Sequence, residues 1–175
     1  NNANMALDAT GNIQIDGIIA NKAGELTIDA KNINAGAVTN AAILNAVAHS
    51  GEIVLGAINN QSGATLTIGD ATTTVIQTGG ITNAENASAA LLASGNITVG
   101  GNIINNGTTL GITSSNGNVQ MGAVTANAGT VAITGQEITL GGALTIAKGA
   151  ATNIDSADIT INGAVDVTGD VIQGA

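Results

Sequence analysis

The sequence predicts an all-β fold, a right-handed parallel β-solenoid with triangular coils, and three observations point to it. Short apolar pairs recur at intervals of 19–22 residues, Gly and Asn separate them, and Phe, Trp, Tyr, Pro and Cys are absent from the chain. Apolar residues still make up 44% of the 175 residues. A core of Ile, Val, Leu and Ala alone suits a narrow, regular interior, and Pro is disfavoured there because it removes a ladder donor.

The apolar pairs define the coils, because each has the i, i+2 alternation of a short strand. The clear pairs are Ile13/Ile15, Ile53/Leu55, Ile97/Val99, Val119/Met121, Ile138/Leu140 and Ile159/Ile161, and Ile33 and Val75 mark the two remaining coils. Coil starts at 13, 33, 53, 75, 97, 119, 138 and 159 are separated by 20, 20, 22, 22, 22, 19 and 21 residues. The sequence therefore predicts about eight coils in a single domain over residues 1–175, with these side chains in the core.

Further apolar pieces follow within each coil, such as Leu26/Ile28 after Ile13/Ile15 and Leu110/Ile112 after Ile97/Val99. We therefore expect three short strands per coil, separated by corners that contain Gly or Asn. Eight coils stacked at about 4.8 Å per rung would form a rod of roughly 40 Å. The right-handed winding is expected because crossovers between parallel strands have that hand.

A polar column accompanies the apolar ones. It consists of asparagines seven or eight residues after each coil start, at Asn21, Asn40, Asn60, Asn83, Asn105 and Asn127. Asn tolerates the left-handed backbone of a tight corner, and stacked amides can hydrogen-bond along the axis as a ladder. Because Asn is abundant in this chain, a column that arises by chance is the alternative.

Two Ala-rich segments interrupt the pattern near residues 40–50 and 83–94. Ala has the highest helix propensity, so stretches of about two helical turns are compatible with both segments. We expect bulged loops that cover the flank of the solenoid with their apolar side inward. A ridge that binds a partner is the alternative.

The charge balance excludes several classes of partner. Lys22, Lys31 and Lys148 are the only basic residues besides His49, against twelve acidic ones, and the net charge is −9. Nucleic acid binding depends on Lys and Arg that neutralise phosphates, and anionic membrane surfaces attract the same residues. No apolar run approaches the roughly 20 residues of a membrane span. We expect neither nucleic acid nor membrane insertion.

No catalytic, cofactor-binding or metal site is expected. His49 is the only histidine and has no partner visible in the sequence for a triad or a metal site. The tightest group of carboxylates, Asp155, Asp158, Asp166 and Asp170, has spacings of three, eight and four, which do not match a calcium loop. Weak calcium binding by this group stays open. A β-helical enzyme that acts on polysaccharides is the least favoured function, because nothing marks a catalytic pair of carboxylates.

Three segments carry a resemblance to a known class of proteins: SGNITVGGNIINNG (94–107), SGEIVLGAINNQSG (50–63) and GQEITLGGALTIAKG (135–149). They resemble the repeats of filamentous-haemagglutinin-type exoproteins and the passenger domains of autotransporter adhesins. The resemblance covers nearly the whole chain, although its motif, G-[NE]-I-x-[VL]-G, is compositional. It implies a secreted β-helical stalk at the bacterial cell surface and transfers no catalytic residue.

The expected function is a structural or adhesive segment, or a subunit, of a secreted or cell-surface fibre. Terminal coils expose unpaired backbone edges, and the sequence shows no obvious cap at either end. We therefore expect a homopolymer that stacks end to end or a longer chain that continues the coils. The alternatives are the stalk of a large monomeric adhesin and a cytoskeletal solenoid polymer. No cofactor is expected, and a host or surface glycan as ligand stays open.

Overall fold

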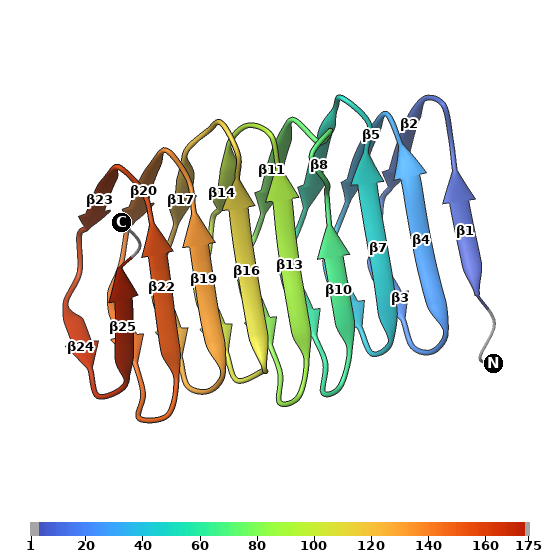
Figure 1. Cartoon of the computed structure of the whole chain (residues 1–175). Coiled ribbons are helices and arrows are strands. Elements are labelled where there is room, and N and C mark those ends of the chain that lie inside the picture. Colours follow the sequence, from blue (N-terminus) through green and yellow to red (C-terminus); the bar gives the residue numbers. More distant parts are fainter. Residues whose placement is uncertain (1–3, 174–175) are drawn as a thin grey trace.

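The computed structural model describes residues 4–173, and these residues form three parallel β-sheets wound into one solenoid. The chain runs up one sheet at the front, turns to the sheet behind and returns, while it advances from right to left in Figure 1, which is a right-handed coil. The predicted all-β solenoid of about eight coils is confirmed. Between residues 4 and 173 there is no helix of the length and apolar character that a bilayer crossing requires.

Each coil contributes one strand to each sheet, named A, B and C in the order in which the chain visits them. Sheet A contains β1 (Met5–Asp8), β4 (Glu25–Ala30), β7 (Ile43–Ala48), β10 (Thr65–Ile68), β13 (Ser88–Ala93), β16 (Thr109–Ser114), β19 (Thr130–Thr134), β22 (Ala151–Asp155) and β25 (Asp170–Gln173). Sheet B contains β2 (Asn12–Ile15), β5 (Asn32–Ala35), β8 (Glu52–Leu55), β11 (Val75–Thr78), β14 (Ile97–Val99), β17 (Val119–Met121), β20 (Glu137–Leu140) and β23 (Asp158–Ile161). Sheet C contains β3 (Ile19–Asn21), β6 (Val38–Asn40), β9 (Ile58–Asn60), β12 (Ile81–Asn83), β15 (Ile103–Asn105), β18 (Val124–Ala126), β21 (Leu144–Ile146) and β24 (Val165–Val167).

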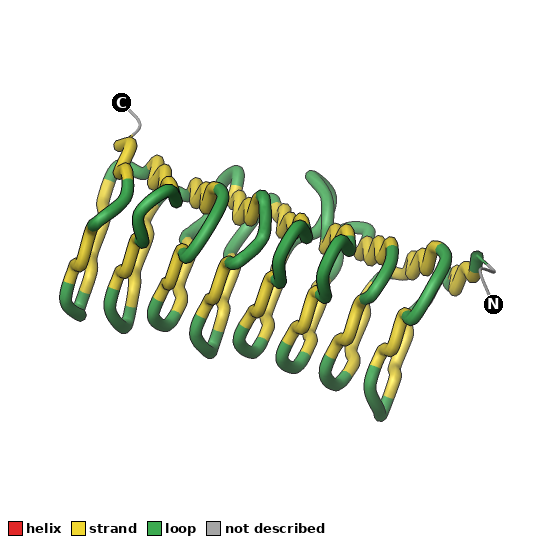
Figure 2. The backbone as a smooth tube through the Cα atoms, turned by 90° about the horizontal axis from the view of Figure 1, so that it is seen from below, coloured by secondary structure: helices red, strands yellow, loops and turns green. Residues whose placement is uncertain are grey.

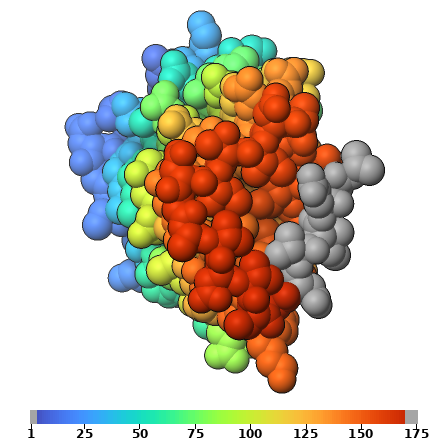
Figure 3. All heavy atoms as spheres, turned by 90° about the vertical axis from the view of Figure 1, so that its left-hand side faces the viewer, coloured from blue at the N-terminus to red at the C-terminus, as the bar shows by residue number. Residues whose placement is uncertain are grey.

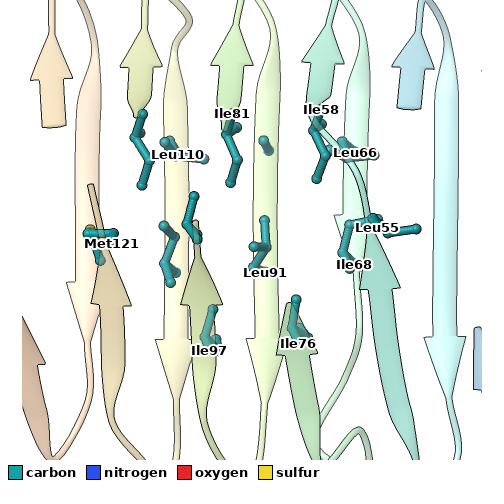
Figure 4. Packing of buried hydrophobic residues seen from close by; sticks show 14 of the residues in the cluster. Leu55, Ile58, Leu66, Ile68, Ile76, Ile81, Leu91, Ile97, Leu110 and Met121 are labelled. Atoms are coloured by element: carbon teal, nitrogen blue, oxygen red, sulfur yellow. The ribbon is translucent and has the colours of Figure 1, made fainter. Parts of the chain in front are cut away.

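The interior is made of inward-facing side chains that form columns along the axis, because consecutive coils pair in register. In sheet B, Ile53 pairs with Ile33 on one side and with Ile76 on the other. Figure 4 shows side chains from all three sheets filling the space between them, among them Ile58 of sheet C, Leu66 of sheet A and Ile76 of sheet B. The core is therefore a continuous aliphatic column between the three sheets.

The structure places the predicted core residues at two levels of burial. Nine are buried, namely Ile33, Ile53, Leu55, Ile97, Val99, Val119, Met121, Ile138 and Leu140. Four in the first and last coils, Ile13, Ile15, Ile159 and Ile161, are partly buried and pack against the same cluster. The difference follows from position, since an end coil has a neighbouring coil on one side only.

Val75 is a correction to the predicted core. Ile76 is the buried residue and pairs with Ile53, whereas Val75 pairs with Glu52 on the outer face. Residues 69–74 form the longest link between sheets A and B. Because of this link, the buried residue of β11 comes one residue later in the sequence than expected. Because side chains alternate between the two faces of a strand, a shift of one residue exchanges the buried position for the exposed one.

The Ala-rich segments near residues 40–50 and 83–94 are also a correction, because they are strands rather than bulged loops. They supply β7 and β13, which take regular places in sheet A. Ala46 of β7 is buried between Ile28 and Ile68 in the same column. A small side chain fits there because both of its neighbours are large, and pairing with two adjacent strands outweighs the helix propensity of Ala.

The corner between sheets B and C carries a glycine in every coil. These glycines are Gly17, Gly36, Gly56, Gly79, Gly101, Gly122, Gly142 and Gly163. The amide of Gly36 donates to the carbonyl of Gly17 at 3.0 Å, and a Cβ at Gly36 would lie 2.6 Å from that oxygen. Glycine therefore allows consecutive coils to approach closely at this corner, and Figure 2 shows the narrow turns stacked at regular intervals.

Candidate functional surfaces

Five buried asparagines form a ladder at the ends of the sheet C strands. Its members are Asn21, Asn40, Asn60, Asn83 and Asn105, and each is 94–100% buried. The Nδ2 of each donates to the Oδ1 of the next at 2.8–2.9 Å. The amides therefore form one continuous chain of hydrogen bonds that all run in the same direction, from the first coil toward the fifth.

The ladder also fixes the corner between sheets C and A. Asn60 Nδ2 donates to the carbonyl oxygens of Ala64 at 3.3 Å and Ser88 at 2.9 Å. Asn83 Nδ2 makes the corresponding bond to the carbonyl of Thr109 at 3.0 Å. Each amide thus satisfies carbonyl groups of the corner that would otherwise be buried without a donor, which is the condition for a polar group to be tolerated in the core.

Asn127 is a correction to the predicted ladder. Ala126 pairs with Asn105 and occupies the ladder column in the next coil, fully buried. Asn127 is exposed, and its Nδ2 donates to Asn106 Oδ1 at 2.8 Å on the surface. The column then continues with Ile146. The ladder position therefore changes from polar to apolar after the fifth coil, and the regular spacing of Asn in the sequence does not show this change.

The two ends of the solenoid are open strand edges. The N-terminal face is the free edge of β1, β2 and β3, and the C-terminal face is the free edge of β23, β24 and β25. Met5 is 56% and Ile18 66% exposed in the first coil, and Val165 is 56% and Val167 40% exposed in the last. Figure 3 shows the molecule from the C-terminal end, where the last coil faces the viewer. Both faces combine unpaired backbone groups with exposed apolar side chains.

His49 has partners that the sequence did not reveal. Its Nε2 lies 2.8 Å from Asp29 Oδ1, one coil earlier, and its Nδ1 lies 3.4 Å from Thr72 Oγ1, in the 69–74 link. Thr72 Oγ1 also donates to Asp70 Oδ1 at 2.7 Å. The imidazole of His49 therefore connects β4 to the 69–74 link.

The 69–74 link is organised by Asp70. Its Oδ1 accepts the backbone amides of Thr72 at 2.8 Å and Thr73 at 3.0 Å in addition to the Thr72 hydroxyl. Partial burial raises the pKa of Asp70, but the hydrogen bonds from Thr72 and Thr73 together outweigh it and hold that pKa below its usual value. The sequence D-x-T-T was the available signal, because Asp accepts bonds from the amides that follow it in a turn.

The structure adds no site to the acidic group near the C-terminus. Asp155 ends β22, Asp158 begins β23 and Asp166 lies in β24, so these three residues come from three different sheets. Among the described residues, no three His, Asp or Glu side chains gather closely enough to hold a metal ion. The expectation that this chain has no metal site stays a prediction, with weak calcium binding by this group as its alternative.

The outer faces of the sheets carry short, mostly uncharged side chains. The middle outer column of sheet B consists of Gln14, Asn34, Val54, Gln77, Thr98, Gln120, Thr139 and Thr160. Depressions on the surface are lined by such outward residues, for example Gln14, Asn34 and Glu52 on sheet B. Comparison of the chain with protein-family models, with curated proteins and with solved structures finds no match.

Proposed function

We propose that this chain is a structural or adhesive β-solenoid segment of a fibre that is secreted or held at the cell surface. One observation carries the proposal. In residues 4–173 every coil repeats one three-strand unit around a filled aliphatic core, so the coils form an uninterrupted rod. A rod of this kind suits a structural role, because each coil is stabilised by its neighbours and the length grows with the number of coils.

The composition of the surface supports a structural role over a catalytic one. The imidazole of His49 contacts Asp29 on one side and Thr72 of the 69–74 link on the other, which suits a role in joining neighbouring coils. The interior is filled by aliphatic side chains and an amide ladder in the described residues. We therefore propose that the segment is not an enzyme and that its repeated coils provide length and rigidity.

Localisation provides the direct test of this function. Antibodies raised against the purified chain, used for immunogold electron microscopy of intact cells that produce it, should label material outside the envelope. Permeabilised cells and an antibody against a cytoplasmic protein provide the controls. Labelling that appears only after permeabilisation would contradict a surface or secreted fibre.

A filament of identical copies is the second candidate, favoured by the exposure of Met5 at one end and Val167 at the other. Such a contact between two different faces does not close and produces a fibre. Negative-stain electron microscopy and light scattering over a range of protein concentrations test it. Rods of several unit lengths would support self-assembly, and rods that keep one length would leave a continuous chain as the source of the fibre.

A further inference from the structure

The imidazole of His49 belongs to a row of polar contacts that crosses three coils. Its Nε2 lies 2.8 Å from Asp29 Oδ1 in the preceding coil, and its Nδ1 lies 3.4 Å from Thr72 Oγ1 in the following one. Thr72 Oγ1 in turn lies 2.7 Å from Asp70 Oδ1. The row therefore runs from one carboxylate through the ring and a hydroxyl to a second carboxylate.

The number of hydrogens decides whether this row is complete. Its three contacts need three hydrogens, and an ionised carboxylate supplies none. A neutral imidazole and the Thr72 hydroxyl supply two, so either tautomer of the ring leaves one contact without a hydrogen. An imidazolium supplies two by itself, which leaves the hydroxyl hydrogen of Thr72 for Asp70. All three contacts are hydrogen bonds only when the ring is protonated.

The tip of the link, residues 70–72, depends on this row because it has few other attachments. Thr74, at the end of the link, is anchored twice, since its amide and its hydroxyl donate to one carbonyl of the preceding coil at 2.8 and 2.7 Å. The tip meets the preceding coil through Thr72, whose carbonyl accepts the amide of Ser50 at 3.1 Å. Ser50 has a φ of 56°, an uncommon conformation for serine, so this attachment relies on a strained backbone.

We propose that His49 is a pH-dependent clamp, in which protonation of the ring fastens the tip of the 69–74 link to the two coils before it and deprotonation loosens the tip. Histidine is the side chain whose charge ordinarily changes between about pH 5 and 8. The tip is therefore held more firmly at the acidic end of this range. The inference goes beyond the proposed function and does not depend on it, because it concerns a property of the isolated chain.

The charged residues on the elements that meet at this corner belong to types that titrate outside this range. They are Asp8 on β1, Asp29 on β4, Lys31 after β4, Glu52 on β8 and Asp70 in the link. Asp and Glu ordinarily titrate near pH 4, and Lys titrates above about pH 10. A change in the link between about pH 5 and 8 therefore reports on the ring.

Nuclear magnetic resonance tests the clamp in the unmodified chain, because the sequence contains a single histidine. The C2–H signal of the ring gives the protonated fraction at each pH. The amides of Thr72 and Thr73 both donate to Asp70, so their hydrogen exchange reports on the tip. We expect their protection factors, which correct for the intrinsic pH dependence of exchange, to be about threefold higher at about pH 5.5 than at about pH 8, a factor typical of an exposed ion pair. The change should follow the titration curve of the ring.

Two variants and an internal control complete the test. His49→Gln keeps a polar side chain that does not titrate, and it should abolish the pH dependence. Thr72→Val removes the hydroxyl between the ring and Asp70, and it should abolish the pH dependence although the ring still titrates. The amide of Gly56, which donates at 2.9 Å at the corner between sheets B and C, should be unaffected by pH. Constant protection of the tip while the ring titrates, or a pH dependence that persists in either variant, would overturn the inference.

Discussion

Polar side chains in the interior fall into two groups, those that have hydrogen-bond partners and those that do not. Asn60 is fully buried and makes hydrogen bonds to both neighbouring coils, whereas Thr152 is fully buried and its Oγ1 has no partner among the described residues. Asn60 lies in the ladder column, and Thr152 lies in an apolar column of sheet A after Val131. The energetic consequences of replacing these two side chains should therefore have opposite signs.

Removal of one ladder amide should be costly. Asn60→Ala deprives Asn40 Nδ2 of an acceptor and Asn83 Oδ1 of a donor, and it leaves the Ser88 carbonyl without its side-chain partner. We expect a loss of about 2–4 kcal/mol, because buried polar groups without partners bear their full desolvation cost. Urea denaturation measures the change. Asn127→Ala, on the surface, should cost less than about 0.5 kcal/mol, and an equal loss from both variants would contradict the ladder.

Thr152→Val should stabilise the chain by about 1 kcal/mol, because it replaces an unpaired buried hydroxyl with a methyl group of similar size. The matched control is Thr73→Val, also at a fully buried position. There the hydroxyl donates to the carbonyl of Ala48 at 3.0 Å, so its removal should destabilise the chain. Thermal unfolding of the two variants should give shifts of opposite sign. Shifts of the same sign would show that hydroxyl pairing does not decide the outcome.

The asparagines also show which positions a sequence pattern can locate and which it cannot. The first five ladder asparagines follow from spacing alone, since each ends a sheet C strand. Asn127 has the same spacing but follows Ala126, which takes the ladder position. The spacing misleads here because the loop from sheet B has two residues in this coil and three in the preceding one, so the ladder position comes seven residues after the coil start and not eight. The partners of His49 could not be found from the sequence either, because Asp29 and Thr72 lie near it only when three coils are stacked.

Strand positions and corner positions differ in the side-chain sizes that they accept, and the corner positions accept a narrower range. Strand positions accept side chains of very different size, since Ala46 shares a column with Ile28 and Ile68. One position of the corner between sheets B and C is glycine in every described coil, and wherever a coil precedes it a Cβ there would lie 2.4–2.9 Å from an atom of that coil. This contrast explains why the expectation of loops in the Ala-rich segments was wrong, whereas the apolar i, i+2 pairs correctly mark six strands of sheet B. Composition is a weak guide to strands that pair on both sides.

The corner requirement can be tested with two glycines. Gly56→Ala would place a Cβ 2.9 Å from the amide nitrogen of Ala37 in the preceding coil, and it should destabilise the solenoid by about 1–3 kcal/mol. Gly111→Ala lies on the outer face of β16, where a Cβ meets nothing within 4 Å, and should be neutral or slightly stabilising. Chemical denaturation compares the two variants. Equal tolerance of both substitutions would show that the corner is not closely packed.

At the scale of the whole molecule, stability is a sum over neighbouring coils. Each inner coil is paired on two sides and each end coil on one, and sequence-distant contacts exist only between adjacent coils. In such one-dimensional arrays, opening begins at the ends and proceeds inward. The repeat period predicted this architecture because one pattern recurs in all eight coils. The partners of individual side chains were less accessible, since the direction of the asparagine ladder is defined only once the coils are stacked.

Hydrogen exchange should therefore show a gradient along the rod. We expect amides in β2 and β23 to exchange faster than those in β11 and β14, by a factor of at least ten, because the end strands open without breaking the inner interfaces. Mass spectrometry of peptides from successive coils measures the gradient in the unmodified chain. Uniform exchange across all coils would instead indicate one cooperative unit. It would contradict the description of stability as a sum of interactions between neighbouring coils.

The stacking of short parallel strands has a consequence for how the rod would respond to tension. One coil advances the rod by about 4.8 Å but contains about 21 residues, which span roughly 70 Å when drawn straight. Pulling the ends apart would detach coils one after another, and each detachment would lengthen the molecule about fifteenfold over its original contribution. Among the first five coils, four of these steps also break an amide–amide bond between asparagines. A rod built in this way would extend under load in small, repeated steps.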